Sequence, residues 1–286
     1  MDGVTDRWLD TEYVPAQPPT ALRRHVLRYL GYRERSTAPV RRRQAPAAGI
    51  ALILGFHPLS LSGPLIGTGA AAAFVGGLSD SWVLTEFTGP QAGIQVDLTP
   101  AALFTLLGGR TVGDGAVPAL DRLEDPELAA LPERLAAAPD WGRRFALVTD
   151  LLADRLLDVR ARRPAPEVAH AWDRLAASAG AVPVTTLAAE TGWSRRHLQA
   201  RFAGQMGLNP RTAGRVLRFA GASRLVGGSR TPLAEVAATC GYADQAHLSR
   251  EFRTLAGTTP SAFRAEWGRF PSVQDTEPGG DDDRAP

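Results

Sequence analysis

One pattern occurs twice in the C-terminal part of the sequence and limits the folds open to it. Residues 183–202 read PVTTLAAETGWSRRHLQARF, and residues 232–252 read PLAEVAATCGYADQAHLSREF. The proline, the apolar positions and the Gly-aromatic pair recur 49 residues later, and a leucine and a phenylalanine recur 50 residues later. Each copy predicts a short apolar helix, a turn at a glycine, and a second helix with polar and basic residues on one side. This is the pattern of a helix-turn-helix, and two in tandem indicate a DNA-binding half.

The distribution of charge supports that interpretation. The formal net charge is only +2, but residues 164–270 hold 13 arginines against 7 acidic residues, and residues 271–286 hold 1 arginine against 5 acidic residues. The chain has no lysine, so every cationic side chain other than histidine is a guanidinium. A planar guanidinium donates hydrogen bonds in pairs, which suits phosphate and guanine. A basic domain beside neutral and acidic segments is the charge distribution expected of a nucleic-acid binder.

A length of 286 residues is sufficient for two domains. The basic segment 160–165, RARRPA, is the expected linker between them. We therefore expect a sensor or dimerisation domain over residues 1–163, a DNA-binding domain over residues 164–270 and a disordered acidic tail over residues 271–286.

The N-terminal half predicts strands followed by helices, so the fold class is α+β. Short apolar runs bounded by turn residues predict strands at residues 40–43, 49–56, 70–75, 82–87 and 93–98. Their short connections favour a small antiparallel sheet or barrel. Helices are expected at residues 21–32, at 100–107 behind a Thr99 cap, and at 126–138 and 140–159. The last of these either completes the core or supplies a dimer face.

The C-terminal half predicts an all-α domain with two helix-turn-helix units joined by a central helix. Helices are expected at residues 166–178, at 210–226 behind Asn209, and at 260–267. Thr231 is the expected cap of the helix that opens the second unit, with Pro232 as its first residue. Ser194 and Asp244 are the expected caps of the two recognition helices, at about 194–203 and 244–255.

Residues 182–267 resemble the DNA-binding domain of the AraC/XylS family of bacterial transcription regulators. The resemblance is carried by GYADQAHLSREFRTLAGTTPSAFR at residues 241–264, with its Gly-aromatic turn, the R-x-F element at Arg250 and Phe252, and the later Gly257 and Pro260. The central helix also has Arg218, Ala222 and Leu225 at the family's usual positions. More weakly, the N-terminal half resembles the variable sensor domains that precede this module, through VDLTP at residues 96–100.

The resemblance implies two recognition helices that read adjacent major grooves. Leu198 and Phe202 face the core in the first helix, and Leu248 and Phe252 do so in the second, which leaves the other sides exposed. The candidate DNA-binding residues are Arg195, Arg196, Gln199, Ala200, Arg201, Gln245, Ala246, His247, Ser249, Arg250 and Arg253. By resemblance Arg196, Gln199 and Ala200 contact bases, whereas Arg201 suits a phosphate. Taken alone, a basic helix face is more often only solvated; the tandem repeat favours the DNA-binding role.

The implied function is a sequence-specific transcription regulator whose principal partner is double-stranded DNA. RNA polymerase, a small-molecule effector and a second copy of the chain are further partner hypotheses. The alternative is a DNA-modifying or ligand-processing enzyme tethered to this module, although no catalytic motif supports it. A third hypothesis is an interaction protein whose N-terminal domain recruits a partner without a ligand.

We expect no cofactor, no bound metal, no catalytic residue and no enzymatic activity. Cys240 is the only cysteine, which fits a reducing cytoplasm, and we interpret it as a packing residue. His57 is either a satisfied core residue or part of a ligand pocket. The uncharged stretch 44–79 is interrupted by proline and glycine, so no membrane-spanning helix is expected and the predicted location is cytoplasmic.

Overall fold

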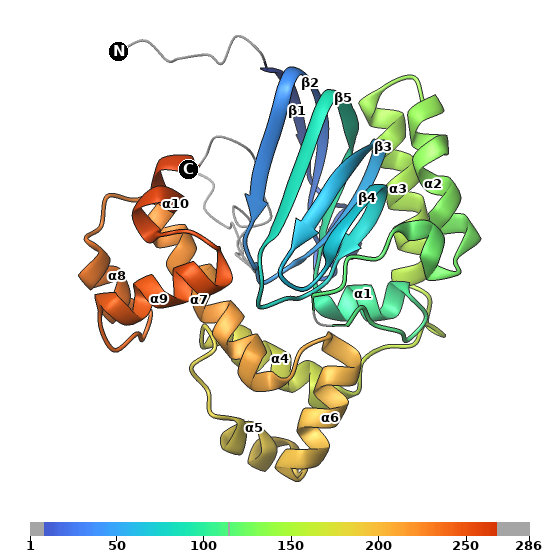
Figure 1. Ribbon diagram of the computed structural model, residues 1–286. Coiled ribbons are helices and arrows are strands. Elements are labelled where there is room, and N and C mark those ends of the chain that lie inside the picture. The colour runs from blue at the N-terminus through green and yellow to red at the C-terminus, as the bar shows by residue number, and fades with distance from the viewer. Residues whose placement is uncertain (1–8, 114, 268–286) are drawn as a thin grey trace, which may run out of the picture.

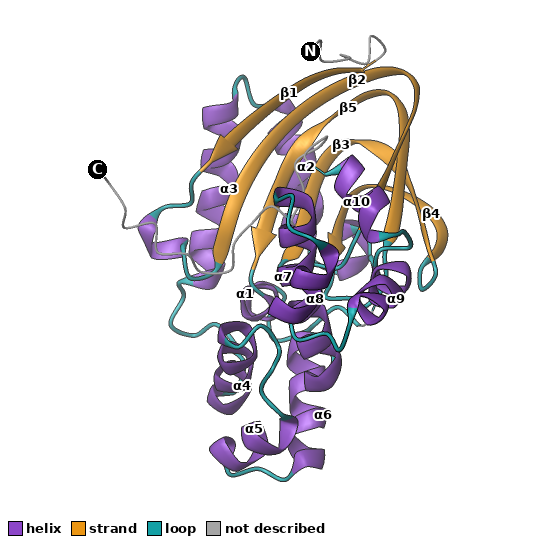
Figure 2. Cartoon of the chain, turned by 90° about the vertical axis from the view of Figure 1, so that its left-hand side faces the viewer, coloured by secondary structure: helices purple, strands orange, loops and turns teal. Residues whose placement is uncertain are grey.

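One antiparallel sheet dominates the N-terminal half of the computed structural model, which describes residues 9–113 and 115–267. The strands are β1 (Leu9–Ala16), β2 (Val26–Gln44), β3 (Ile50–Gly63), β4 (Gly67–Gly76) and β5 (Val83–Leu98). Their order is β1-β2-β5-β3-β4, and the long strands curve strongly (Figure 2). Because β1 and β4 end this order, the expected antiparallel structure is an open sheet, not a closed barrel.

Three helices cover one face of the sheet, as Figure 1 shows: α1 (Pro100–Leu106), α2 (Pro126–Ala137) and α3 (Trp141–Leu156). The rings of Tyr29 in β2 and Phe145 in α3 stack with centroids 6.1 Å apart. The remaining apolar stripe of α3 is buried in the same core: Val148, Leu151, Leu152 and Leu156. These residues of the predicted helix 140–159 therefore contribute to the core of the sheet domain.

Alternating side chains give the sheet two different faces. Leu52 and Leu54 of β3 and Val96 of β5 belong to the core that the helices cover. Ile53 and Gln95 point the other way, toward a cavity on the concave face. Ile53 pairs with Gln95 and Leu54 pairs with Ile94, so side chains of β3 and β5 that point to the same face lie side by side.

The helix predicted over residues 21–32 is wrong. A single 3-10 turn, η1 (Thr20–Leu22), is followed directly by β2. Leu22 is buried in this turn, and Val26 and Tyr29 are buried in the extended chain of β2. β2 pairs with β1 on one side and with β5 on the other, so hydrogen bonds to distant segments override a local pattern that also fits a helix.

Two further strand predictions require correction. Residues 82–87 and 93–98 are not separate strands, because β5 runs from Val83 through to Leu98. Pro90 cannot donate a hydrogen bond to the neighbouring strand, and the residue before it, Gly89, has φ 87°. At this point the pairing of β5 with β2 shifts in register, between Ser36 and Val40 of β2. Residues 40–43 form the end of β2, where this strand pairs with β5 on one side and lies beyond its pairing with β1 on the other.

The C-terminal half contains α4 to α10. Their bounds are α4 (Pro166–Ala177), α5 (Val184–Thr191), α6 (Arg195–Met206), α7 (Pro210–Gly228), α8 (Leu233–Thr239), α9 (Gln245–Leu255) and α10 (Pro260–Glu266). The expected arrangement of two helix-turn-helix units, α5–α6 and α8–α9, joined by a central helix α7, is confirmed (Figure 1). The predicted cap at Thr231 is wrong, since Pro232 is the cap residue of α8 and the hydroxyl of Thr231 bonds Ser229. The predicted tail over residues 271–286 lies outside the described residues.

Each unit turns at a glycine with a left-handed backbone. Gly192 has φ 70° and Gly241 has φ 72°, conformations that cost a side chain-bearing residue energy. Behind the first of these turns, the core of the first unit contains Phe202 packed against Trp172 of α4.

None of the described helices combines the length and the apolar character needed to cross a bilayer.

His25 predicts a stability that depends on pH. Its side chain is buried, and this burial, followed by the nearby Arg24 and Arg163 charges, lowers its pKa from 6.5 to about 4. Between pH 6.5 and 4 the unfolded chain therefore binds more protons than the folded chain, and the stability present above pH 6.5 is lost as the pH falls. We expect the free energy of unfolding to drop by about 2 kcal/mol from pH 7 to pH 5 on this account.

Urea unfolding of the wild type and of His25→Asn at the two pH values would test this prediction. The variant should lose most of the difference between pH 7 and pH 5. An identical pH dependence in both proteins would show that another group is responsible.

Candidate functional site

The second helix of each unit begins at a side-chain cap. The Ser194 hydroxyl accepts a hydrogen bond from the His197 amide at 3.2 Å, and the Asp244 carboxylate accepts one from the His247 amide at 2.6 Å. Both predicted caps are therefore present. Each histidine also lies edge-on to the aromatic residue of its own turn, His197 to Trp193 and His247 to Tyr242. The two recognition helices thus start with the same local geometry.

Buried leucine and phenylalanine side chains fix which side of each helix faces outward. Leu198 and Phe202 of α6 and Leu248 and Phe252 of α9 are all fully buried. The following predicted DNA-contact residues are exposed: Arg195, Arg196, Gln199, Ala200, Arg201, Gln245, Ala246, Arg250 and Arg253. Two predicted contact residues, His247 and Ser249, are only half-exposed.

The outward arginines differ from the arginines that hold the domain together. Arg174 forms an ion pair with Glu190 at 2.9 Å, and Arg264 donates to the carbonyls of Val226 and Thr231. In contrast, no carboxylate of the described residues lies within ion-pair distance of any predicted contact arginine. Those guanidinium groups keep their charge and their donors available for an external anion.

The central helix holds the two recognition helices apart. α7 has 19 residues, which corresponds to about 28 Å of helix. α6 and α9 lie near opposite parts of α7 in both views (Figures 1 and 2). Major-groove faces on one side of a duplex recur about every 34 Å. The length of the connector is therefore of the right order for two neighbouring grooves.

The second unit also contacts the sheet domain. Arg215 of α7 lies 3.1 Å from Asp80, in the loop between β4 and β5, and donates two hydrogen bonds, of 2.8 and 2.9 Å, to Glu251 of α9. Next to this network, Trp82 packs so closely on Gly257 that a Cβ there would lie 2.5 Å from the indole nitrogen. The second unit is thus seated on a loop that also forms part of the wall of a cavity.

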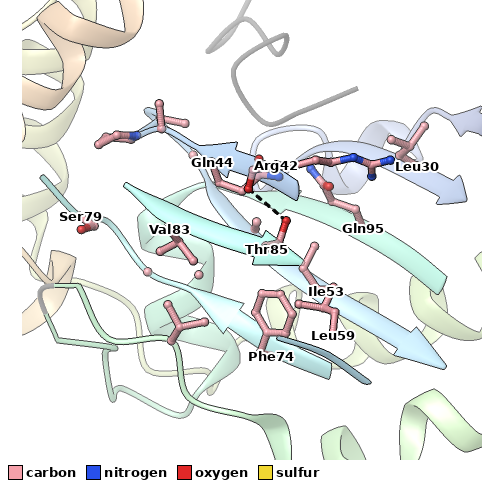
Figure 3. A pocket seen from close by; sticks show the side chains of 18 of the residues that line it. Leu30, Arg42, Gln44, Ile53, Leu59, Phe74, Ser79, Val83, Thr85 and Gln95 are labelled. Carbon is pink, nitrogen blue, oxygen red and sulfur yellow. Dashed lines mark hydrogen bonds between the residues drawn. The ribbon is translucent and has the colours of Figure 1, made fainter. Parts of the chain in front are cut away.

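That cavity lies on the concave face of the sheet and has a volume of about 190 Å³ (Figure 3). Its apolar wall comes from four strands and includes Leu30, Ile53, Leu59, Phe74 and Val83. Polar side chains, among them those labelled Gln44, Thr85 and Gln95 in Figure 3, also line it. The structure thus contains an apolar pocket with a small number of polar groups, the usual composition of a ligand site.

A buried ion pair supplies the charge of the cavity. Glu34, whose side chain is 2% exposed, accepts two hydrogen bonds from Arg42 at 2.9 and 2.8 Å and one from the Tyr13 hydroxyl. Burial, and then the Glu34 charge, raise the pKa of the Tyr13 and Tyr32 phenols, so both remain protonated donors. Gln91, 3% exposed, donates to the Pro58 carbonyl, and within the part of the chain described its side-chain oxygen has no donor.

Sequence reasoning did not locate this cavity. The single histidine considered for a ligand pocket, His57, is half-buried and lines a separate hollow beside Asp10 and Glu12. Cys240 packs partly buried against the core of the second unit, and burial raises the pKa of its thiol, which disfavours a nucleophilic role. The described residues contain no group of three His, Cys, Asp or Glu side chains that could hold a metal ion.

Comparisons with known proteins agree with the geometry of the C-terminal half. Residues 187–266 match the family model described as a helix-turn-helix domain. No curated protein sequence matches the chain.

Several solved structures are similar. The C-terminal domain of AraT, a response regulator from Geobacillus stearothermophilus, is 22% identical, with 39% of this chain and 92% of that chain covered and a TM-score of 0.35. The DNA-binding domain of AdpA, a global transcriptional factor, in complex with a target DNA is 30% identical over 35% and 92%, with a TM-score of 0.33. ToxT from Vibrio cholerae is 10% identical over 92% and 100%, with a TM-score of 0.49.

The match to the family model covers the two helix-turn-helix units. The matched segment contains both recognition helices and the connector α7. Within it, Gly241 makes the left-handed turn, Arg250 is exposed, and Phe252 is buried, as the R-x-F signature of the second unit requires. The C-terminal part of this chain is therefore a tandem helix-turn-helix domain of the AraC type.

Proposed function

We propose that this chain is a sequence-specific transcription regulator in which α6 and α9 read adjacent major grooves of one duplex. One observation carries the proposal: two capped, core-anchored helices present arginines that no carboxylate of the described residues neutralises. A helix fits the major groove, and its outward residues near the N-terminus reach the base edges. A monomer with two such helices can then read two neighbouring grooves.

The outward side chains suggest different roles. Arg196 and Arg250 are suited to guanine and Gln199 to adenine, with about 1–3 kcal/mol of discrimination for each good bidentate pair. Ala200 and Ala246 offer apolar contact, which suits a thymine methyl group. Phosphate contacts fix the register and carry the salt dependence of binding. The complete proposed set is Arg195, Arg196, Gln199, Ala200, Arg201, Gln245, Ala246, His247, Ser249, Arg250 and Arg253.

Selection from a random duplex library tests the proposal directly. The full chain should enrich one site with two half-sites about one helical turn apart. Uniform binding of all sequences, set only by salt concentration, would contradict a sequence-specific role.

Arg250→Ala and Arg201→Ala should have different effects. We expect Arg250→Ala to lose about 1–3 kcal/mol of discrimination at one base pair and to relax the preference there. Arg201→Ala should weaken binding to all sequences by a similar factor and leave the preferred site unchanged. Binding curves for the selected site and its single-base variants separate the two results. The same base preference in wild type and Arg250→Ala would argue against a base contact by Arg250.

For the N-terminal domain, proposed as residues 1–163, the cavity favours sensing of a small molecule. Its 190 Å³ is below the roughly 300–1,000 Å³ of pockets for drug-sized ligands, so the effector would be small. The Arg42–Glu34 pair and Gln91 offer polar contacts inside an apolar wall. A ligand bound only by the folded chain at 100 times its Kd would add about 2.7 kcal/mol to stability. Thermal shift of the full chain against small metabolites tests this role.

A further inference from the structure

A second groove, separate from the sheet cavity, lies between the two helix-turn-helix units. It has a volume of about 850 Å³ and crosses the N-terminal half of α7. One wall is the segment that leads into α5, and the other is the side of α9 that carries His247 and Glu251. The groove is thus lined by the segment between α4 and α5, by α7 and by α9, so it lies along the connector between the two units.

Three arginines of α7 line this groove, and two of them have an available charge. Arg215 is held by the carboxylates of Glu251 and Asp80, so its charge is already paired, and this trio carries a net charge of −1. Arg211 is exposed, and Arg218 makes a single long hydrogen bond, of 3.5 Å, to the carbonyl of Gly180. Neither Arg211 nor Arg218 has a carboxylate partner among the residues described. The groove therefore presents two guanidinium groups to whatever enters it.

Backbone donors add to this positive charge. α5 begins behind Pro183 without a side-chain cap, and the first backbone N–H that donates in its opening turn is that of Thr186, to the Pro183 carbonyl. The start of α7, at Pro210 and Arg211, lies on the floor of the same groove. The positive ends of two helix dipoles thus lie beside the two arginines.

The position of the groove identifies an anion that would fit it. Two successive major grooves on one face of a duplex are separated by the minor groove and its two flanking sugar-phosphate strands. A protein that places α6 and α9 in those major grooves must hold its connector over these strands. Phosphates carry the charge that Arg211 and Arg218 would neutralise.

We propose that this groove is a backbone-binding site, in which Arg211 and Arg218 contact phosphates of the DNA between the two half-sites. The inference deepens the proposed DNA-binding function and rests on it. The two arginines add affinity but no base preference, because phosphate contacts carry no sequence information directly. They also fix the register of α6 relative to α9 along the duplex.

The test compares Arg211→Ala, Arg218→Ala and the double variant with the wild type, using the full chain. The slope of log K against log salt concentration should decrease by about 0.9 for each phosphate that the variant no longer neutralises, and so by about 2 in the double variant. The selected sequence should stay the same. Arg211→Lys and Arg218→Lys keep the charge and should largely retain the slope. Arg134→Ala removes an exposed arginine from α2, far along the chain, and is the matched charge control.

A second measurement locates the contact on the DNA. Neutral methylphosphonates placed between the two half-sites should weaken binding of the wild type but not weaken the double variant further. A double variant whose salt slope and methylphosphonate response match Arg134→Ala would overturn the inference. The slope can be measured on any duplex. Absence of sequence preference in the wild type would therefore reject the proposed regulator, while the slope would still decide whether the groove binds the backbone.

Discussion

Phe252→Ala should destabilise the second helix-turn-helix unit and abolish recognition of one half-site. Phe252 is fully buried, and its ring meets Phe219 of α7 at 4.9 Å and Phe263 of α10 at 5.3 Å between centroids. Truncation of a buried phenylalanine typically costs about 3–5 kcal/mol. This side chain joins α7, α9 and α10, so the loss falls on the packing that holds α9 in place.

Amide hydrogen exchange of the full chain measures the expected loss of stability in each segment. Amides of α8 to α10 should exchange faster in Phe252→Ala, whereas those of the sheet and of α5–α6 should change little, because the core of the first unit is a separate cluster. In DNA binding, the half-site read by α6 should survive selection and the other should disappear.

The neighbouring Arg253→Ala provides the control. Arg253 is exposed, so its truncation should leave protection of α8 to α10 within about 0.5 kcal/mol of the wild type while reducing DNA affinity. Equal exchange in Phe252→Ala and Arg253→Ala would mean that α9 does not depend on this core.

The parts of this structure that were predictable from sequence are those that local interactions determine. Gly192 and Gly241 mark turns because the left-handed backbone there favours glycine at that one position. Ser194 and Asp244 mark helix starts because a cap bonds an amide only three residues away. Thr99 is a third example, since its hydroxyl accepts from the Ala102 amide.

The errors occurred where distant segments decide the outcome. Residues 26–32 repeat apolar side chains at spacings that fit a helix as well as a strand, and pairing with β1 and β5 selects the strand. The same reason hid the sheet cavity. Ile53 and Gln95 meet only because β3 and β5 pair in one particular register, which no local pattern in either segment specifies.

The sequence does not identify the groove arginines, for a related reason. Arg218 lies at a usual position of the family's central helix, and no local pattern distinguishes Arg211. Both line a groove because the turn at Gly180 packs directly on α7, where a Cβ at that glycine would lie 1.9 Å from the Gly214 carbonyl oxygen. That approach brings the start of α5 close to the arginines, and only the folded structure reveals it.

The other large effect expected concerns the buried pair in the sheet domain. Arg42→Met removes the guanidinium that donates two hydrogen bonds to Glu34. The Glu34 side chain is 2% exposed, and in the variant it still accepts a hydrogen bond from the Tyr13 hydroxyl. Breaking a buried ion pair from one side typically costs about 3–5 kcal/mol, because the remaining charge is poorly solvated. Urea unfolding of the full chain, followed by a signal from the sheet domain, should show a loss of this size.

The adjacent pair separates burial from simple charge removal. Arg41 of β2 forms an ion pair with Glu86 of β5, but the Arg41 side chain is 68% exposed, so Arg41→Met should change stability much less. Arg42→Met combined with Glu34→Gln should cost less than the sum of the two single changes, since neither then leaves a buried charge behind. Additive costs, or equal losses in Arg41→Met and Arg42→Met, would show that the pair is effectively solvated and that the polar end of the cavity is open to water.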